Sequence, residues 1–342
     1  MIDNPSADPD QKPRLALAAE GARPSPTAPR WASFGNWLQK QTIFILVLVL
    51  IAASALVSDV FLTPRNIINV IRVASIAGLV TFGEALVLLG GRFDLSVGTT
   101  LAAAGSAFLL LEPQGLVVAT AGALLTGIVI GSINGLFVAV LDANALIVTL
   151  GMSSAVMGLL LIVTKAAFLT GHDPAFTFFG RADVAGIPVP VIIFLLSLVL
   201  LELLLRKTPF GRSIYAMGHN QEGAFASGIP VIRIRFLSYV LCGMMAALGG
   251  IVLTARLNSA EAVAGVGYEF DAITACILGG ISLAGGEGSM VRASVGVLTL
   301  TILSNLLVLL NAPFTSQLMV KGSVFVFMVA LDSIIKQRGR RQ

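Results

Sequence analysis

The sequence predicts an all-α polytopic membrane protein of about ten transmembrane helices with two glycine-broken segments. Hydrophobic residues make up 56% of the 342-residue chain, only 12% of residues are charged, and the mean hydropathy is +0.92. A soluble domain carries roughly 25% charged residues, so lipid must be the solvent for much of this chain. Helices are expected because a helix pairs its own backbone amides in lipid. This composition excludes a soluble enzyme, a nucleic-acid-binding domain and a disordered chain.

The chain divides into three regions. Residues 1–41 hold six prolines among alanine, serine and mixed charges. They cannot bury enough apolar surface to offset their chain entropy, so we expect a disordered cytoplasmic tail. Residues 42–335 form the transmembrane domain, which includes a polar cytoplasmic segment at 206–236. Residues 336–342 form a basic cytoplasmic C-terminus.

Ten apolar runs are long enough to be considered as spans. A helix that crosses the hydrocarbon core needs ~20 residues, and ~17 can suffice. The run at 271–286 is the weakest, because Gly279 and Gly280 interrupt it and a run that short can be re-entrant. The predicted spans are residues 43–62, 67–89, 95–111, 115–141, 146–164, 189–205, 237–255, 271–286, 290–310 and 317–335.

The distribution of Lys and Arg predicts the orientation of these spans. Ten spans place both ends of the chain on one side of the membrane. Sixteen of the 22 basic residues then fall on that side and four on the other, while Arg72 and Lys321 lie within spans. Since basic residues concentrate on the cytoplasmic side, we expect both termini and the 206–236 segment in the cytoplasm.

Two glycine-rich segments interrupt the membrane region at corresponding places in its two halves, at 90–98 and 279–289. Such interruptions indicate a transport pathway, because broken helices direct backbone dipoles toward a cavity. Glycines that simply end helices and turn the chain are the alternative, and we favour the pathway. Asp94 and Ser96 suit the N-cap of the third helix as well as a pathway, and both roles can hold. The candidate pathway residues are Glu84, Gly91, Asp94, Ser96, Gly279 and Gly280.

Three charged residues lie within predicted spans. Arg72 and Glu84 are ~18 Å apart along one helix and cannot pair with each other. Arg72 and Lys321 lie near helix ends, where long side chains can reach the interface. Glu84 is deeper, so it must be partnered, protonated or directed into a cavity.

Small residues repeat at a spacing of four on two other predicted helices. Gly127, Gly131 and Gly135 lie on one of them, and Gly243 and Ala247 on the other. Ridges of small residues let helix backbones approach closely. This pattern predicts close packing, within the chain or with a second copy.

The cytoplasmic segment at 206–236 contains a short capped helix. Asn220 can cap its start, Gly228 can end it, and Pro230 prevents its continuation. Ala224 and Phe225 contribute to an apolar side. That side suits a groove on another protein, and the basic flanks suit the surface of a lipid bilayer equally well.

At this point the sequence resembles a known family. Five segments show the resemblance: Gly91 to Gly98, Gly218 to Pro230, Tyr268 to Ile273, Gly279-Gly280 and Gly285 to Ser289. Together they are similar to the monosaccharide-type permease subunits of bacterial ATP-binding-cassette importers, which include importers of ribose, xylose, galactose and autoinducer-2. The resemblance covers roughly residues 42–335, and its motifs are specific to the family but not to a substrate.

The resemblance implies a set of partners. The segment at 206–236 would be the coupling segment that docks in a groove of a cytoplasmic ATPase. A second permease subunit, identical or not, and an external substrate-binding protein would complete an assembly in the bacterial inner membrane. ATP and Mg would be bound by the ATPase, with no cofactor in this chain. The coupling residues would be Gly218, Asn220, Glu222, Ala224, Ser227 and Gly228.

The chain departs from the family pattern at two places. Gly223 stands where the family commonly has alanine, which loosens the coupling helix by ~1 kcal/mol. Arg92-Phe93 stands in place of the usual isoleucine of the Gly-Gly-Ile-Asp pattern. This difference is a candidate cause of a substrate range that differs from that of other family members.

The expected function is that of a permease subunit for a monosaccharide or a related small polar solute, not of an enzyme. The sequence has no Gly-Lys pair and hence no phosphate-binding P-loop. His172 and His219 are predicted on opposite sides of the membrane, so they cannot form one metal site. The alternative is an ion-coupled secondary transporter that uses Glu84 or Asp94 as its ion site. The capped cytoplasmic helix favours the importer, because a secondary transporter needs no docking helix.

Overall fold

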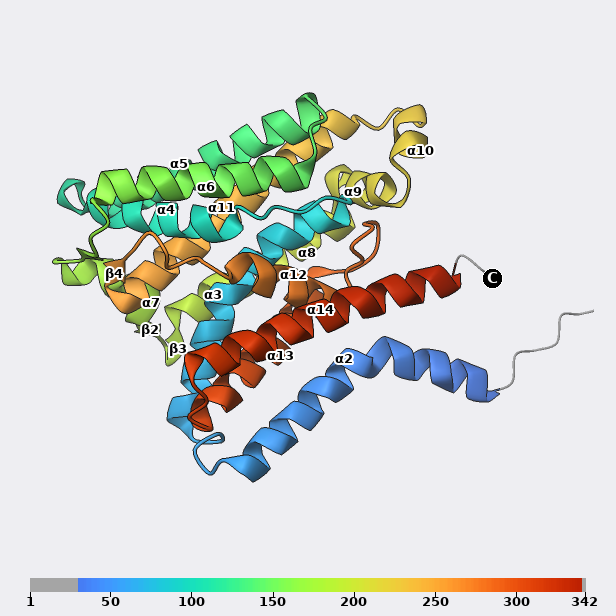
Figure 1. Cartoon of the computed structure of the whole chain (residues 1–342), viewed down its shortest axis with the longest axis horizontal. Helices are drawn as coiled ribbons and strands as arrows, with labels where there is room; N and C mark the ends of the chain where they lie inside the picture. Colours follow the sequence, from blue (N-terminus) through green and yellow to red (C-terminus); the bar gives the residue numbers. More distant parts are fainter. Residues whose placement is uncertain (1–29, 340–342) are drawn as a thin grey trace, which may run out of the picture. The chain divides into compact units, whose positions relative to one another are not determined.

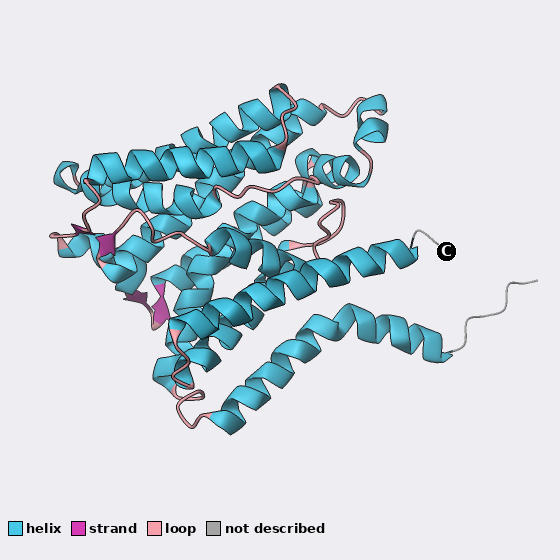
Figure 2. Ribbon diagram, in the orientation of Figure 1, coloured by secondary structure: helices cyan, strands magenta, loops and turns pink. Residues whose placement is uncertain are grey.

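The computed structural model describes residues 30–339, which are almost entirely helical with two short pairs of strands (Figure 2). The expected disordered tail lies mostly outside this range, at 1–29, and helix α2 begins at Arg30. The basic C-terminus lies outside it from residue 340. The helices that correspond to the predicted spans are α2 (Arg30–Val57), α3 (Pro64–Leu89), α4 (Val97–Leu110), α5 (Leu116–Gly135), α6 (Ala145–Thr164), α8 (Val189–Lys207), α11 (Val231–Leu257), α12 (Tyr268–Leu278), α13 (Met290–Leu309) and α14 (Phe314–Gly339).

Six helices in the described range are long and apolar enough to cross a membrane: α3, α5 with the π-helical turn η3 (Leu136–Val140), α6, α8, α11 and α13. The all-α polytopic class is therefore confirmed, while the number of ten crossings stays a prediction. α3 and α11 are buried over most of their length, whereas most residues of α6 and α8 are not buried and many of their apolar side chains are exposed. Such exposed apolar surface is what lipid covers.

Two helices are shorter than a full crossing. α12 has 11 residues and α4 has 14, which correspond to about 16 Å and about 21 Å against a hydrocarbon core of about 30 Å. The predicted span at 271–286 is wrong in its second half, because α12 ends at Leu278 and a loop follows. Gly280 enters the left-handed region there, with φ of 78°, which ends the helix.

The remaining elements connect these helices. Two-residue strands pair β1 (Leu169–Thr170) with β4 (Ser259–Ala260) and β2 (Asp183–Val184) with β3 (Ile187–Pro188), both antiparallel. Arg72 forms an ion pair with Asp183 at 2.8 Å. Its charge is therefore paired within the protein, in addition to the predicted reach of its side chain to the membrane–water interface. The short helices are η2 (Glu112–Gln114), η4 (Pro174–Thr177), α7 (Phe178–Arg181), α9 (Pro209–His219) and α10 (Gln221–Ala226).

α11 is the centre of the packing, since it contacts α3, α4 and α5 along its length (Figure 1). The predicted ridges of small residues form its contact with α5. A Cβ atom added at Gly131 would overlap the Tyr239 carbonyl, and one added at Gly127 would overlap the Gly243 carbonyl. The prediction of close packing is thus confirmed within the chain.

We expect Gly127→Ala to lower the free energy of unfolding by about 1–3 kcal/mol, because its Cβ has no space between α5 and α11. The matched control is Gly158→Ala on α6, where nothing lies within 4 Å of the added Cβ. Thermal unfolding of the detergent-solubilised protein measures both. Equal melting temperatures for the two variants would contradict the α5–α11 contact.

Candidate functional site

The segment at 206–236 folds into two consecutive helices, α9 and α10. Asn220 joins them, and its Oδ1 accepts a hydrogen bond from the Gly223 amide at 3.0 Å, as predicted for the cap. Gly228, with φ of 80°, follows the end of α10 at Ala226 by two residues, as predicted for the glycine that ends this helix. α9 was not predicted, although Thr208 followed by Pro209 is a typical helix start, with the Thr208 hydroxyl accepting from the Gly211 amide at 3.4 Å.

α10 has one buried and one exposed side. Ala224 is buried in the main hydrophobic core. Phe225 is 74% exposed, and Gln221 and Glu222 are exposed beside it. An exposed phenylalanine next to an anchored small residue gives this face an apolar contact point with a charged neighbour.

Arg235, a residue that the sequence did not indicate, links α10 to the loop before α6. Its side chain is only 4% exposed. Its Nη1 lies 3.2 Å from Asp142 Oδ1, and its Nη2 donates to Gln221 Oε1. A buried cation needs such partners, so Arg235 holds these two segments to the start of α11. Only its place among apolar residues could have indicated this role.

Three glycine-containing segments, one of them the C-terminal end of α9, contact one another directly. We call Gly91, Gly218, Gly285 and Gly286 the glycine junction. The Gly286 amide donates to the Leu89 carbonyl at 2.9 Å. A Cβ at Gly218 would overlap that carbonyl and the Gly286 amide, and a Cβ at Gly285 would lie 2.6 Å from the Gly91 nitrogen. The two glycine-broken segments and the 206–236 segment, which are separate in the sequence, therefore contact one another through their backbones.

A second contact reinforces the junction. The Tyr215 hydroxyl of α9 donates to the Gly288 carbonyl at 2.9 Å. The His219 ring lies where a Cβ of Gly286 would be. α9 is thus fixed to the loop between α12 and α13.

Three of the candidate pathway residues form a buried polar network at the start of α4. The Asp94 amide donates to Glu84 Oε1 at 3.1 Å, so Glu84 is partnered. Asp94 Oδ1 accepts from the Ser96 amide at 2.8 Å and from the Ser96 hydroxyl at 2.6 Å. The Asn134 side-chain amide donates to Asp94 Oδ2 at 3.2 Å and to Ser96 Oγ at 2.8 Å. All four side chains are buried, and Asn134 is a member that the sequence did not indicate.

The other candidate pathway residues lie elsewhere. Gly91 belongs to the glycine junction. Gly279 packs on the backbone of α13 at Arg292, and the Arg292 guanidinium lies near Gly280. Ser96 precedes α4, but its side chain makes no capping bond and binds Asp94 instead. The pathway role of these residues stays a prediction.

Comparison with known proteins places this arrangement in a family. Residues 66–329 match the family described as "Branched-chain amino acid transport system / permease component". The chain is 41% identical to the ribose import permease protein RbsC of Bacillus subtilis over 309 residues, which cover 87% of this chain and 94% of the relative.

Two further relatives are similar over most of their length. The D-allose transport system permease protein AlsC of Escherichia coli is 35% identical over 327 residues, 95% of this chain and 98% of the relative. The L-arabinose ABC transporter permease protein AraH of Azospirillum brasilense is 32% identical over 332 residues, again 95% and 98%. No solved structure matches the chain.

We expect Ser96→Ala to lower the free energy of unfolding by about 1–3 kcal/mol, because it removes a donor to the buried Asp94 carboxylate and the acceptor of Asn134. Ser75→Ala is the control, since Ser75 is equally buried but donates only within its own helix, to the Ile71 carbonyl. Thermal unfolding in detergent compares the two. If Ser75→Ala destabilises the protein as much as Ser96→Ala, the hydrogen bonds of the buried polar network do not contribute more to stability than a hydrogen bond within one helix.

Proposed function

This chain belongs to the family of permease components that residues 66–329 match. We propose that it is the membrane-spanning subunit of an ATP-driven importer for a monosaccharide or a related small polar solute. The observation that carries the proposal is the coupling segment, α9 with α10, whose exposed face suits a partner and whose buried face contacts both glycine-broken segments through backbone. An ion-coupled secondary transporter would need no such docking element.

A sugar is the substrate class that the relatives favour. The family description names branched-chain amino acids. The relatives that align over nearly their whole length are named for ribose, D-allose and L-arabinose. We therefore propose a pentose or hexose, selected mainly by an external substrate-binding protein.

The proposed mechanism is a mechanical relay. ATP binding on a cytoplasmic partner moves α10, which is held to α11 by Arg235 and Gln221. α9 moves with it and displaces the glycine junction, because backbone contacts leave no slack there. One loop of the junction leads into α4 and the other follows α12, so the two short helices change position together. This chain supplies no chemistry of its own, and ATP and Mg would be bound by the ATPase.

The proposed assembly contains a second permease subunit, identical or not, an ATPase and an external binding protein, in the bacterial inner membrane. Both termini and residues 206–236 face the cytoplasm, in keeping with the distribution of basic residues. The ATPase would grip the face of α10 that exposes Phe225 and Glu222. Ala224 would anchor that face in the core, Asn220, Ser227 and Gly228 are themselves exposed beside it, and Gly218 would support it from α9.

We expect Phe225→Asp to abolish copurification of the ATPase and ATP-dependent uptake, because it places a charge at the apolar docking point. Glu222→Lys should weaken both. Phe168→Asp is the control, since Phe168 is 73% exposed but lies before β1, at the end proposed to face outward. Pull-down and uptake in membrane vesicles measure the effects. Full ATPase binding by Phe225→Asp would refute α10 as the docking helix.

We expect Gly218→Val to reduce uptake by roughly tenfold or more while the ATPase still binds. The added side chain overpacks the glycine junction, at a cost of about 1–3 kcal/mol, and so blocks the relay. It leaves the docking surface on α10 unchanged. Gly223→Ala is the control: its Cβ would meet only the Asn220 side chain, at 3.1 Å, and alanine favours the helix. The ratio of uptake to ATP hydrolysis separates the two variants. Unchanged uptake by Gly218→Val would exclude the junction from coupling.

A further inference from the structure

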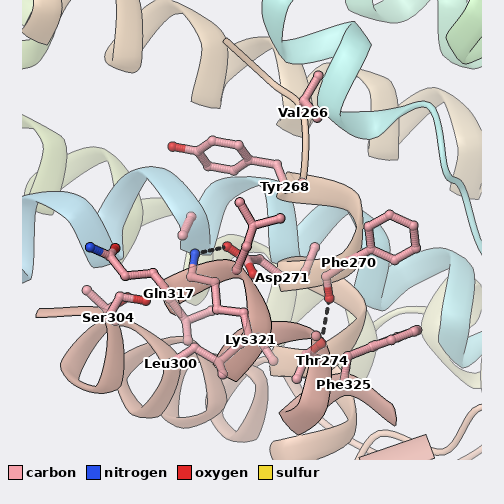
Figure 3. Close-up of a pocket in the computed structure, with 18 of the residues that line it drawn as sticks. Val266, Tyr268, Phe270, Asp271, Thr274, Leu300, Ser304, Gln317, Lys321 and Phe325 are labelled. Atoms are coloured by element: carbon pink, nitrogen blue, oxygen red, sulfur yellow. Dashed lines mark hydrogen bonds and ion pairs between the residues drawn. The ribbon is translucent and has the colours of Figure 1, made fainter. Parts of the chain in front are cut away.

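A cavity of about 640 Å³ lies between α3, α12, α13 and α14 (Figure 3). It is at the N-terminal end of α12, whereas the glycine junction follows the C-terminal end of the same helix. None of the candidate pathway residues lines it. Apolar side chains form most of its walls, and the polar side chains that line it are Tyr268, Asp271, Thr274, Thr301, Ser304, Gln317 and Lys321.

An ion pair crosses the wall of the cavity from α12 to α14. Lys321 Nζ lies 2.6 Å from Asp271 Oδ2, and the two side chains are 34% and 33% exposed (Figure 3). Lys321 lies about 10 Å along α14 from its start at Phe314. Ionised groups at such depth are costly in lipid and usually mark a pathway. The sequence indicated Lys321 only as a residue that can reach the interface, not as the partner of Asp271.

The exposed third of each charged side chain indicates what fills the cavity. An acyl chain there would leave the remaining hydrogen-bonding capacity of both groups unsatisfied in an apolar medium. Water or a hydroxyl-bearing solute would satisfy it. The Ser304 hydroxyl and the Gln317 amide border the same space and offer further donors and acceptors.

The walls also limit the chemical class of the solute. Lys321 and Asp271 neutralise each other, so the cavity favours neither an anion nor a cation. Tyr268, Phe270 and Phe325 line it, and the rings of Phe270 and Phe325 pack edge to face at 5.5 Å between centroids. Aromatic walls with a few polar groups suit a solute that has apolar C–H faces and hydroxyl edges.

We propose that this cavity is a water-filled chamber that holds a neutral polyhydroxylated solute during passage, with Asp271, Lys321, Gln317 and Ser304 as its hydrogen-bonding groups. The proposal rests on the proposed import function and names a site for it. α12 forms one wall of the chamber and leads into the loop of the glycine junction. A shift of the junction would therefore move the wall that carries Asp271.

The first test asks whether the cavity holds water. The two variants compared are Ser304→Cys and Met319→Cys. Ser304 lies five residues before the end of α13 and Met319 five residues after the start of α14, so the two positions have similar depth. Ser304 lines the cavity, whereas Met319 does not line it and is 73% exposed. In the assembled complex in vesicles, a charged, membrane-impermeant methanethiosulfonate should label the Ser304→Cys variant at least tenfold faster than the Met319→Cys variant. The native Cys242 and Cys276 are buried and give the background. Equal labelling of the two variants would overturn the water-filled chamber.

The second test asks whether the solute passes through it. We expect Ser304→Trp to reduce uptake of radiolabelled D-ribose, D-allose or L-arabinose, whichever the wild type imports, at least tenfold while ATP hydrolysis continues. Met319→Trp should import normally. Normal uptake by Ser304→Trp would overturn this site and leave the importer proposal intact. A wild-type complex without ATP-dependent uptake of any small polar solute would instead refute the proposed function.

Discussion

Direct contact between backbones at the glycine junction is the constraint on which the rest of the arrangement depends. Gly218 lies against Leu89 and Gly286, and Gly285 lies against Gly91, with no room for a side chain. Contacts between side chains can be relieved by rotamer changes, but contacts between backbones cannot, since moving one segment requires moving the other. α9, the loop before α4 and the loop after α12 therefore behave as one mechanical unit in the described part of the chain.

The membrane environment explains why irregular backbone is confined to such places. Unpaired amides are costly in lipid, so broken helices persist only where protein groups satisfy them. At the start of α4, the buried carboxylate of Asp94 accepts the Ser96 amide, and Glu84 accepts the Asp94 amide. After α12, the Gly286 amide pairs with the Leu89 carbonyl. The close backbone contact at Gly218 and the hydrogen bond from the Tyr215 hydroxyl to the Gly288 carbonyl connect these loops to the coupling segment.

The sequence predicted features that depend on local chemistry. Apolar runs predicted the helices, Asn220 and Gly228 predicted α10, and small residues predicted the α5–α11 contact. The sequence did not predict features created by tertiary contacts: Arg235 bridging Asp142 and Gln221, Lys321 pairing with Asp271, or Asn134 joining Asp94. Each partner lies at least 14 residues away on another element, and a single sequence contains no signal for such pairs. The second half of the 271–286 run was mispredicted because its apolar composition outweighed Gly279 and Gly280.

The central claim is that the coupling segment and the glycine-broken loops move together. Spin labels on Ala226 of α10, Arg92 of the loop before α4 and Phe168 near β1 would measure this by double electron–electron resonance in the assembled complex. We predict that ATP binding changes the Ala226–Phe168 distance and leaves the Ala226–Arg92 distance unchanged. A shift between Ala226 and Arg92 as large as that between Ala226 and Phe168 would contradict the account.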